Sequence, residues 1–348
     1  MSDTQRTIDI DDKLLRDLAI RSDKMITLNL RIINKKTLKN VLINRKIIID
    51  PFFWTNGALS WALHKYEELG YQKIETPGND KLLKKKHSVR IVDNALYFYA
   101  NYDNYSERVN NQVYNFLRNC QQDDYGSILY RNNNDSAFID TLGMICPFLA
   151  KYGFKNNSKK ATSLAVIQLR AFFKNGFDEK SGLPYHGYNS RSLVKHGIIG
   201  WGRGVGWALV GLVDTLQWLD PQSLEYLEIN KYYNYLIKSV MKYQRTDGSF
   251  SWQLESVEGH EDTSASAMIG YSISKYNNLN QKKIYMKQLS LIVKSLLTNI
   301  KKNGTVINSS AECLGFSMYP QIFNSNSWGQ GFTTLCLIEY KELAKNYE

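Results

Sequence analysis

Residues 204–216, GVGWALVGLVDTL, are the clearest indication of the fold class. This stretch is apolar almost all round a helix, with Asp214 as its one charged residue, and such a helix has to be covered by protein on every side. Five similar runs occur along the chain, and each begins with a small or polar residue that leads into an apolar helix. They begin at Asn56 (NGALSWALHKYEELG), Asp93 (DNALYFYANYDNY), Asp140 (DTLGMICPFLAKYG), Asp262 (DTSASAMIGYSISKY) and Gly329 (GQGFTTLCLIEYKEL). The pattern predicts an internal repeat.

Amphipathic segments alternate with the apolar runs and carry apolar residues at spacings of three and four on one face. They are residues 107–119, 159–174, 227–243 and 281–301. Helices with one apolar face can cover wholly apolar helices from outside. The simplest closed arrangement is therefore an inner ring of six helices surrounded by an outer ring. We therefore predict an all-α domain, an (α/α)6 barrel or six-hairpin toroid, over residues 51–348, with residues 1–50 as a helical segment packed on it. An irregular helical array is the alternative.

Composition supports a globular, helix-rich chain with an anionic ligand. The 348 residues are 43% hydrophobic and 22% charged, with only six prolines, as in folded helical proteins. Lys and Arg exceed Asp and Glu by 44 − 33 = 11, an excess that attracts nucleic acid, anionic lipid or an acidic sugar. No zinc-finger, RNA-recognition or helix-turn-helix signature accompanies the basic stretch at residues 81–90, so we expect no nucleic-acid partner.

Location, cofactors and assembly follow from what the sequence lacks. The first 15 residues are polar and acidic, without the apolar core of a secretory signal. The least charged long window, residues 198–219, contains Arg203, Asp214 and five glycines, unlike a membrane span. We expect a cytoplasmic protein without a membrane partner, a monomer or weak homodimer. Four widely separated cysteines predict buried free thiols, and without CxxC or HExxH motifs we expect no metal and no cofactor.

Parallel inner helices would gather their N-termini at one mouth of the barrel. Unpaired N–H groups and the positive ends of the helix dipoles there favour an anionic ligand. The polar and aromatic residues expected at this mouth are Asn56, Asp93, Asp140, Trp201, Arg203, Asp262 and Trp328.

Asp93 and Asp140 each open an apolar helix. Acid and base catalysis on a glycosidic or related bond requires at least two carboxyl groups at one pocket. The alternative is that each carboxylate only caps its helix, because aspartate is a preferred N-cap residue.

The segment WGRGVGW, residues 201–207, favours a sugar acid as ligand. An arginine pairs with a carboxylate and tryptophans cover apolar sugar faces, whereas the alternative is a glycine-rich loop with core tryptophans and a structural arginine. Residues 185–188 (YHGY), with His186, are expected in a polar loop between helices.

Six segments in this order carry a family resemblance: FIDTLGMICPFLAKYG, GLPYHGYN, GWGRGVGWALVGLVDTL, DGSFSWQ, EDTSASAMIGYSI and WGQGFTTLCLIEY. From Trp54 to the C-terminus the chain resembles the unsaturated rhamnogalacturonyl and glucuronyl hydrolases, glycoside hydrolase families 105 and 88, with the rhamnogalacturonyl branch closer. The resemblance implies an (α/α)6 barrel that removes a 4,5-unsaturated uronic acid from lyase-generated oligosaccharides by hydration of the C4=C5 bond.

The resemblance also implies roles for single residues. Asp140 would be the general acid and base, with Asp93 as its partner. The residues implied to line the sugar pocket are His186, Trp201, Arg203 and Trp207, with Asn56 and Trp328 at its rim.

Two positions depart from the family pattern. Val205 stands where the family usually has asparagine, and Asp262 stands where glutamate is common. Other functions for the same toroid are an enzyme acting on a saturated sugar, a lyase, or a carbohydrate-binding protein without activity.

Overall fold

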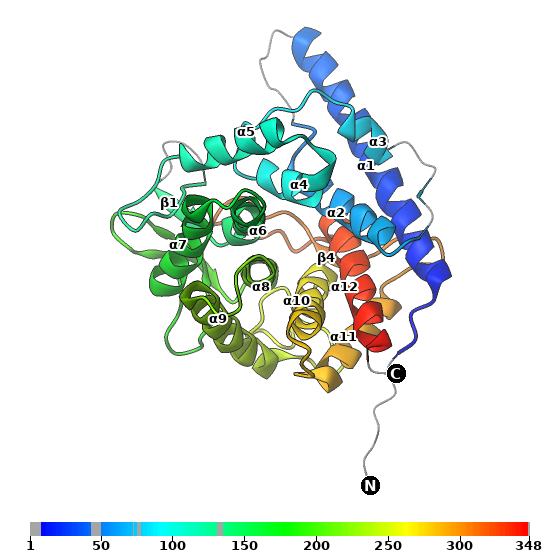
Figure 1. Ribbon diagram of the computed structural model, residues 1–348. Coiled ribbons are helices and arrows are strands. Elements are labelled where there is room, and N and C mark those ends of the chain that lie inside the picture. Colours follow the sequence, from blue (N-terminus) through cyan, green and yellow to red (C-terminus); the bar gives the residue numbers. More distant parts are fainter. Residues whose placement is uncertain (1–7, 43–49, 72, 75–77, 131–134, 347–348) are drawn as a thin grey trace.

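The computed structural model describes residues 8–42, 50–71, 73–74, 78–130 and 135–346. Within this part of the chain, six apolar helices form an inner ring (Figure 1). They are α2 (Trp54–Glu68), α4 (Asn94–Ala100), α6 (Asp140–Lys155), α8 (Gly202–Leu216), α10 (Thr263–Asn280) and α12 (Ser327–Lys345). Each packs against the next and α12 packs against α2, so the ring closes. The (α/α)6 prediction is confirmed, and each inner helix begins within two residues of its expected start.

Amphipathic helices cover the ring from outside. They are α1 (Asp12–Leu42), α3 (Gly78–Leu83), α5 (Glu107–Arg118), α7 (Lys159–Asn175), α9 (Leu224–Val240) and α11 (Met286–Thr298). In α5, the apolar residues Val109, Val113 and Leu117 are buried on one face, as the spacing predicts. The helix expected from residue 281 begins only at Met286, because Gln281 and Tyr285 have left-handed backbone angles that turn the chain.

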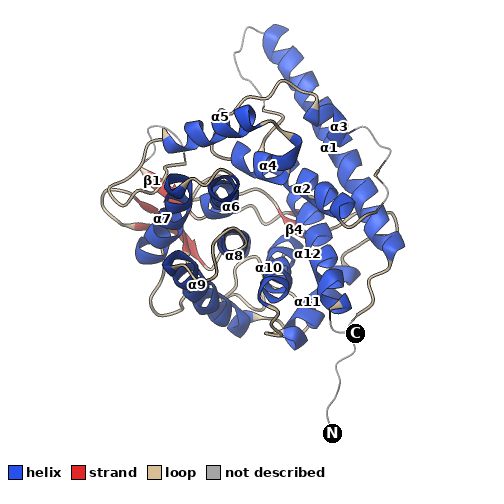
Figure 2. Cartoon of the chain, in the orientation of Figure 1, coloured by secondary structure: helices blue, strands red, loops and turns tan. Residues whose placement is uncertain are grey.

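Small sheets were not predicted (Figure 2). Strands β1 (Ser136–Phe138), β2 (Tyr185–Asn189) and β3 (Lys195–Ile199) form one antiparallel sheet, and β4 (Ser309–Ser310) pairs with β5 (Phe323–Asn324). The expectation of a polar loop around His186 is therefore wrong, since these residues form the central strand of a sheet. The strand is short and contains a glycine, so its sequence carries no strand periodicity.

The N-terminal helix α1 packs along α2 and α12 and also contacts α3. Of the expected helical segment 1–50, residues 1–7 and 43–49 lie outside the described residues. The domain boundary at residue 50 stays a prediction.

A buried polar cluster lies toward the C-terminal ends of the inner helices. Asp214 of α8 is fully buried and accepts hydrogen bonds from the hydroxyls of Tyr99 and Tyr271, at 2.8 and 3.0 Å. Glu339 of α12 lies 3.4 Å from the amino group of Lys275. Burial raises the pKa of Asp214 from 3.8 to about 6, so its carboxylate form destabilises the folded state.

The Asp214→Asn variant is expected to lose one component of the pH dependence of stability. Between about pH 4 and about pH 6, the unfolded state releases a proton from Asp214 that the folded state keeps, so the free energy of unfolding of the wild type falls as pH rises. The pKa difference corresponds to a fall of about 3 kcal/mol, at about 1.4 kcal/mol per pKa unit. Denaturant unfolding of both proteins across this range measures the difference.

The exposed Asp220→Asn variant, in the loop after α8, is the control and should follow the wild type. A constant difference between wild type and Asp214→Asn at every pH would contradict the assignment.

Candidate active site

A cavity of about 380 Å³ opens at the N-terminal ends of the inner helices. Four residues that the sequence singled out line it: Asp140, His186, Trp201 and Arg203. They come from α6, β2 and the start of α8, segments that the fold brings together from far apart in the chain.

Asp140 is the first residue of α6 and follows β1 after one residue, Ile139, which occupies the N-cap position in its place. Its Oδ2 lies 3.1 Å from Nε2 of His186, and the Asp140 side chain is 14% exposed. His186 lies where the pairing of β2 with β3 shifts register, an irregularity that re-aims a side chain. The backbone N–H of Ile139 donates to the carbonyl of His186, so strand and helix hold the pair together.

Asp93 precedes α4 and makes no capping hydrogen bond. It is 1% exposed, and its Oδ2 accepts a hydrogen bond of 2.8 Å from the hydroxyl of Tyr130. Tyr130 lines the cavity, whereas Asp93 lies behind it. The structure therefore excludes simple capping for both aspartates, and it places Asp140 in the cavity and Asp93 behind its wall.

Arg203 is a buried cation held between two indole rings. Its guanidinium carbon lies 4.8 Å from the ring centre of Trp201 and 5.1 Å from that of Trp328. Nη1 donates to the carbonyl and hydroxyl oxygens of Ser310, and Nη2 donates to the carbonyl of Ala311. Those bonds leave the Nε–H and one Nη2–H of its five donors.

No aspartate or glutamate in the described ranges forms an ion pair with Arg203. It is only 1% exposed, and an arginine without a counter-ion at such a site favours an anionic ligand.

Three residues expected at the sugar lie elsewhere. Trp207 is fully buried and packs edge-on against Trp54, with ring centres 5.7 Å apart. Asn56 donates to the carbonyl of Pro51 and accepts from the amide of Asn29, so it joins α2 to α1. Trp328 donates to the carbonyl of Ser310 behind Arg203. None of the three is among the described residues that line the cavity, because each is used in packing between helices.

Several residues of the cavity wall were not predicted from the sequence. The missed residues are Trp54, Tyr130, Phe138, Met144 and residues 312–315. Trp54 was missed because the first apolar run was predicted to begin at Asn56, two residues after the observed start of α2 at Trp54. The loop between β4 and β5 has no periodic pattern, and Phe316 anchors it by stacking on Phe138 at 4.1 Å.

The expectation of buried cysteines is wrong for two of the four. Cys146 and Cys336 are buried, but Cys120 and Cys313 are partly exposed. Cys313 lines the cavity, with Sγ 4.0 Å from Nε2 of His186. Burial raises the pKa of the Cys313 thiol to about 12, so it stays protonated near neutral pH.

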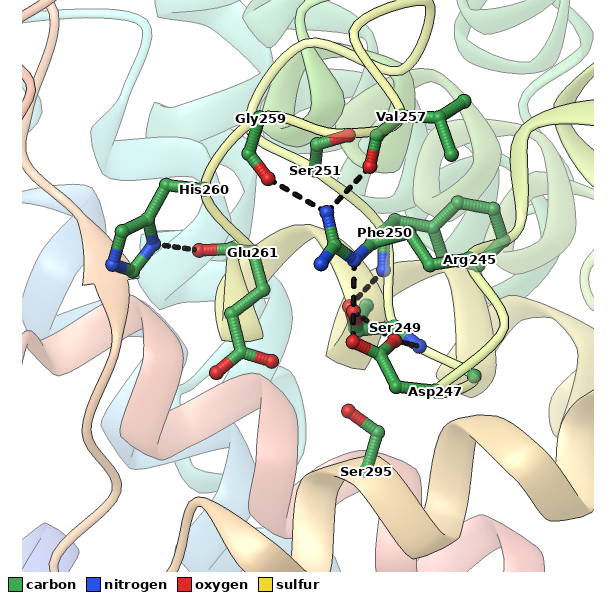
Figure 3. Close-up of polar contacts among 12 residues, drawn as sticks. Arg245, Asp247, Ser249, Phe250, Ser251, Val257, Gly259, His260, Glu261 and Ser295 are labelled. Carbon is green, nitrogen blue, oxygen red and sulfur yellow. Dashed lines mark hydrogen bonds and ion pairs between the residues drawn. The ribbon is translucent and has the colours of Figure 1, made fainter.

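The segment DGSFSWQ, residues 247–253, supports Trp201 from behind. The N–H of Gly202 donates to the carbonyl of Trp252, and Trp201 pairs with Gln253 in an isolated bridge. Figure 3 shows the adjoining turn, where the guanidinium of Arg245 donates to the carbonyls of Val257 and Gly259.

Asp247 completes this arrangement. One of its carboxylate oxygens lies 3.3 Å from Nε of Arg245, and the other accepts from the N–H and hydroxyl of Ser249 (Figure 3). A single guanidinium thus joins both sides of the loop that backs the cavity.

The Arg245→Ala variant is expected to lower the free energy of unfolding by about 2 kcal/mol, because hydrogen bonds from a charged donor are lost. Denaturant unfolding measures the change. Lys242→Ala, an exposed change three residues earlier, should leave stability unchanged. Equal stability of Arg245→Ala and the wild type would show that the loop does not depend on this guanidinium.

The described ranges lack two features. They contain no cluster of three or more histidine, cysteine, aspartate or glutamate side chains suited to hold a metal ion. Likewise, none of their helices is both long and apolar enough to span a bilayer.

The chain is similar to a known family over most of its length. Residues 65–344 match the model of Glycosyl Hydrolase Family 88. The unsaturated rhamnogalacturonyl hydrolase YesR of Bacillus subtilis (strain 168) is 21% identical over 228 residues. That match spans 61% of this chain and 61% of YesR.

Solved structures share the fold. A possible member of the GH105 family from Klebsiella pneumoniae superposes with a TM-score of 0.81 at 19% identity, over 100% of this chain and 97% of the other. An unsaturated glucuronyl hydrolase specific for heparin superposes with a TM-score of 0.65 at 19% identity, over 84% and 86% of the two chains. At these identities the likeness establishes the (α/α)6 fold.

Proposed function

Because the chain belongs to glycosyl hydrolase family 88, we propose that it removes a 4,5-unsaturated uronic acid from the non-reducing end of lyase-generated oligosaccharides. One observation carries the proposal: a cavity of about 380 Å³ combines Arg203, a buried cation without a carboxylate partner among the described residues, with the hydrogen-bonded pair Asp140 and His186. Oligosaccharides of the rhamnogalacturonan type are the preferred substrates, as the match to YesR supports.

Arg203 binds the carboxylate of the uronic acid in this proposal. Its Nε–H and remaining Nη2–H are the donors left by the bonds to Ser310 and Ala311, and a guanidinium suits a planar carboxylate. Trp54, Trp201 and Phe138 add aromatic surface to the same cavity, which suits the apolar faces of a sugar ring.

Hydration of the C4=C5 bond needs one group that first gives and then takes a proton. Asp140 protonates C4, and the positive charge that develops at C5 and the ring oxygen is stabilised by the Asp140 carboxylate just formed, with Asp93 behind the cavity wall as a more distant negative charge. Water adds at C5 while the Asp140 carboxylate takes its proton. The hemiketal then opens between C5 and the ring oxygen, leaving a ketone at C5. The hemiacetal formed at C1 expels the neighbouring sugar as an alcohol, so one water is consumed.

The proposal is tested by following the ultraviolet absorbance of the C4=C5 bond. The protein is mixed with unsaturated disaccharides from pectin and from glycosaminoglycan lyase digests, beside its Asp140→Asn variant. Loss of absorbance with the wild type only supports the reaction and the role of Asp140. If no disaccharide is consumed, an enzyme acting on saturated sugars, a lyase, or a binding protein becomes the better description, and tight binding without turnover would identify the last.

The cytoplasmic location, the monomeric or weakly dimeric state and the absence of a cofactor stay predictions from the sequence. Sedimentation analysis over a range of protein concentrations tests the assembly state.

A further inference from the structure

His186 has a hydrogen-bond partner on each ring nitrogen, and the second partner is Tyr319. Nε2 lies 3.1 Å from Oδ2 of Asp140, and Nδ1 lies 2.7 Å from the hydroxyl oxygen of Tyr319. The histidine is 1% exposed, and three aromatic rings besides Tyr319 surround it. Because the ring is shielded from bulk water, the positions of its protons depend on these two partners.

The fold makes room for the Tyr319 hydroxyl. Gly197 of β3 has a φ of +78°, and a Cβ at this position would lie 2.5 Å from that oxygen and 2.6 Å from Cβ of His186. Any larger residue at position 197 would push the two groups apart. The glycine therefore permits a close approach that the hydrogen bond requires.

The neighbour of Gly197 favours one direction for the hydrogen bond between Tyr319 and His186. The backbone N–H of Ile198 points to the Tyr319 oxygen at 3.4 Å, and a backbone N–H only donates. With the oxygen accepting from Ile198, we assign the hydroxyl proton of Tyr319 to Nδ1 of His186. Burial raises the pKa of Tyr319, so the hydroxyl keeps its proton. With Nδ1 as acceptor, the neutral imidazole carries its proton on Nε2 and donates it to Asp140.

We propose that Tyr319 is a positioning residue that acts through His186 to set the protonation of Asp140. The inference rests on the proposed function, in which Asp140 is the acid and base. By favouring the Nε2–H tautomer, Tyr319 keeps an N–H directed at Asp140, which stabilises the carboxylate that Asp140 becomes after it has protonated C4 and that then takes a proton from water. Without the hydroxyl, Nδ1 of His186 loses the donor that favours the neutral imidazole over the imidazolium.

Other charged and titratable groups near His186 come from three elements. Cys313, on the same loop as Tyr319, lies 4.0 Å from Nε2 and is a neutral thiol. Arg203 of α8 and Glu312 line the same cavity. His196 of β3 stacks on the far side of Phe316, with ring centres 5.2 Å apart. None of these groups contacts Nδ1, so the effect of Tyr319 is separable from theirs.

The Tyr319→Phe variant tests the proposal, because it keeps the ring and removes the hydroxyl. We expect the alkaline limb of the pH profile of kcat/KM to move to higher pH by about one unit. The reason is that the free energy of one hydrogen bond corresponds to about one pKa unit. We also expect kcat at the optimum to fall by about tenfold, with KM unchanged because Tyr319 does not line the cavity.

Tyr226→Phe is the matched control, because it removes a hydroxyl that donates to Asn280 at the C-terminal end of α10, whereas the cavity opens at the N-terminal ends of the inner helices. Its pH profile should superimpose on that of the wild type. A Tyr319→Phe profile that also superimposes, or that falls equally at every pH, would overturn the proposal and leave Tyr319 a structural role. Absence of turnover by the wild type would instead contradict the proposed function.

A second measurement needs neither turnover nor a folded variant. The ¹⁵N chemical shifts of the His186 imidazole in the wild-type protein report which nitrogen carries the proton. We expect a protonated Nε2 and an unprotonated Nδ1 once the pair has lost its second proton. The opposite tautomer would overturn the proposal.

Discussion

Asp140→Asn is expected to lower kcat by about 10³-fold on unsaturated disaccharides. The amide can neither protonate C4 nor take a proton from water, and general acid–base catalysis contributes on this order. Asparagine has almost the same shape and can still accept the Nε2–H of His186, so the fold should persist. Initial rates from the ultraviolet absorbance, with thermal unfolding measured in parallel, separate the two effects.

Asp135→Asn is a suitable control for this prediction. Asp135 precedes β1 and pairs with the exposed Arg191 at 3.2 Å, and surface ion pairs contribute little. Its activity should equal that of the wild type. Wild-type activity in Asp140→Asn would remove Asp140 from the mechanism and leave His186 as the remaining titratable group of the pair.

Arg203→Lys is expected to raise KM by between about tenfold and 100-fold, with a smaller change in kcat. A lysine offers one point charge and no planar fork, so it cannot hold the carbonyls of Ser310 and Ala311 and also bind a carboxylate with two bonds. The effect should be larger for unsaturated uronic acids than for their methyl esters, which lack the negative charge. Steady-state kinetics on both substrates measure this difference.

Arg170→Lys provides the control, because Arg170 forms an exposed ion pair with Glu228 on the outer helices. It should leave KM unchanged. If Arg203→Lys also leaves KM unchanged, Arg203 only anchors β4 and the loop that follows it.

The repeat of apolar runs was sufficient to predict the ring of inner helices. A helix such as α8, whose residues are buried on all sides, has a composition that no outer helix shares, so sequence alone separates the two rings. Strands β4 and β5 were missed because they span two residues each, which is too short for any periodic pattern.

A site residue could be predicted where it is also the first residue of an inner helix, as Asp140 is. Asp262 shows that this position in the repeat does not by itself make a catalytic residue. It occupies the same position in the repeat as Asp140, yet it caps α10 by accepting a hydrogen bond from the N–H of Ser264. Its other oxygen accepts from the hydroxyl of Ser310, the residue that holds Arg203. Pairings such as Asp140 with His186 depend on tertiary structure, which residue spacing does not encode.

Ring closure between α12 and α2 has a consequence for synthesis in the cell. Helix α12 completes the ring and follows the other five inner helices in chain order, so α2 and α10 each keep an uncovered apolar face until α12 has been synthesised. Contacts between residues so distant in sequence form slowly, and exposed apolar faces promote aggregation in the meantime. A chain that stops before α12 would therefore leave the apolar faces of α2 and α10 exposed to other chains.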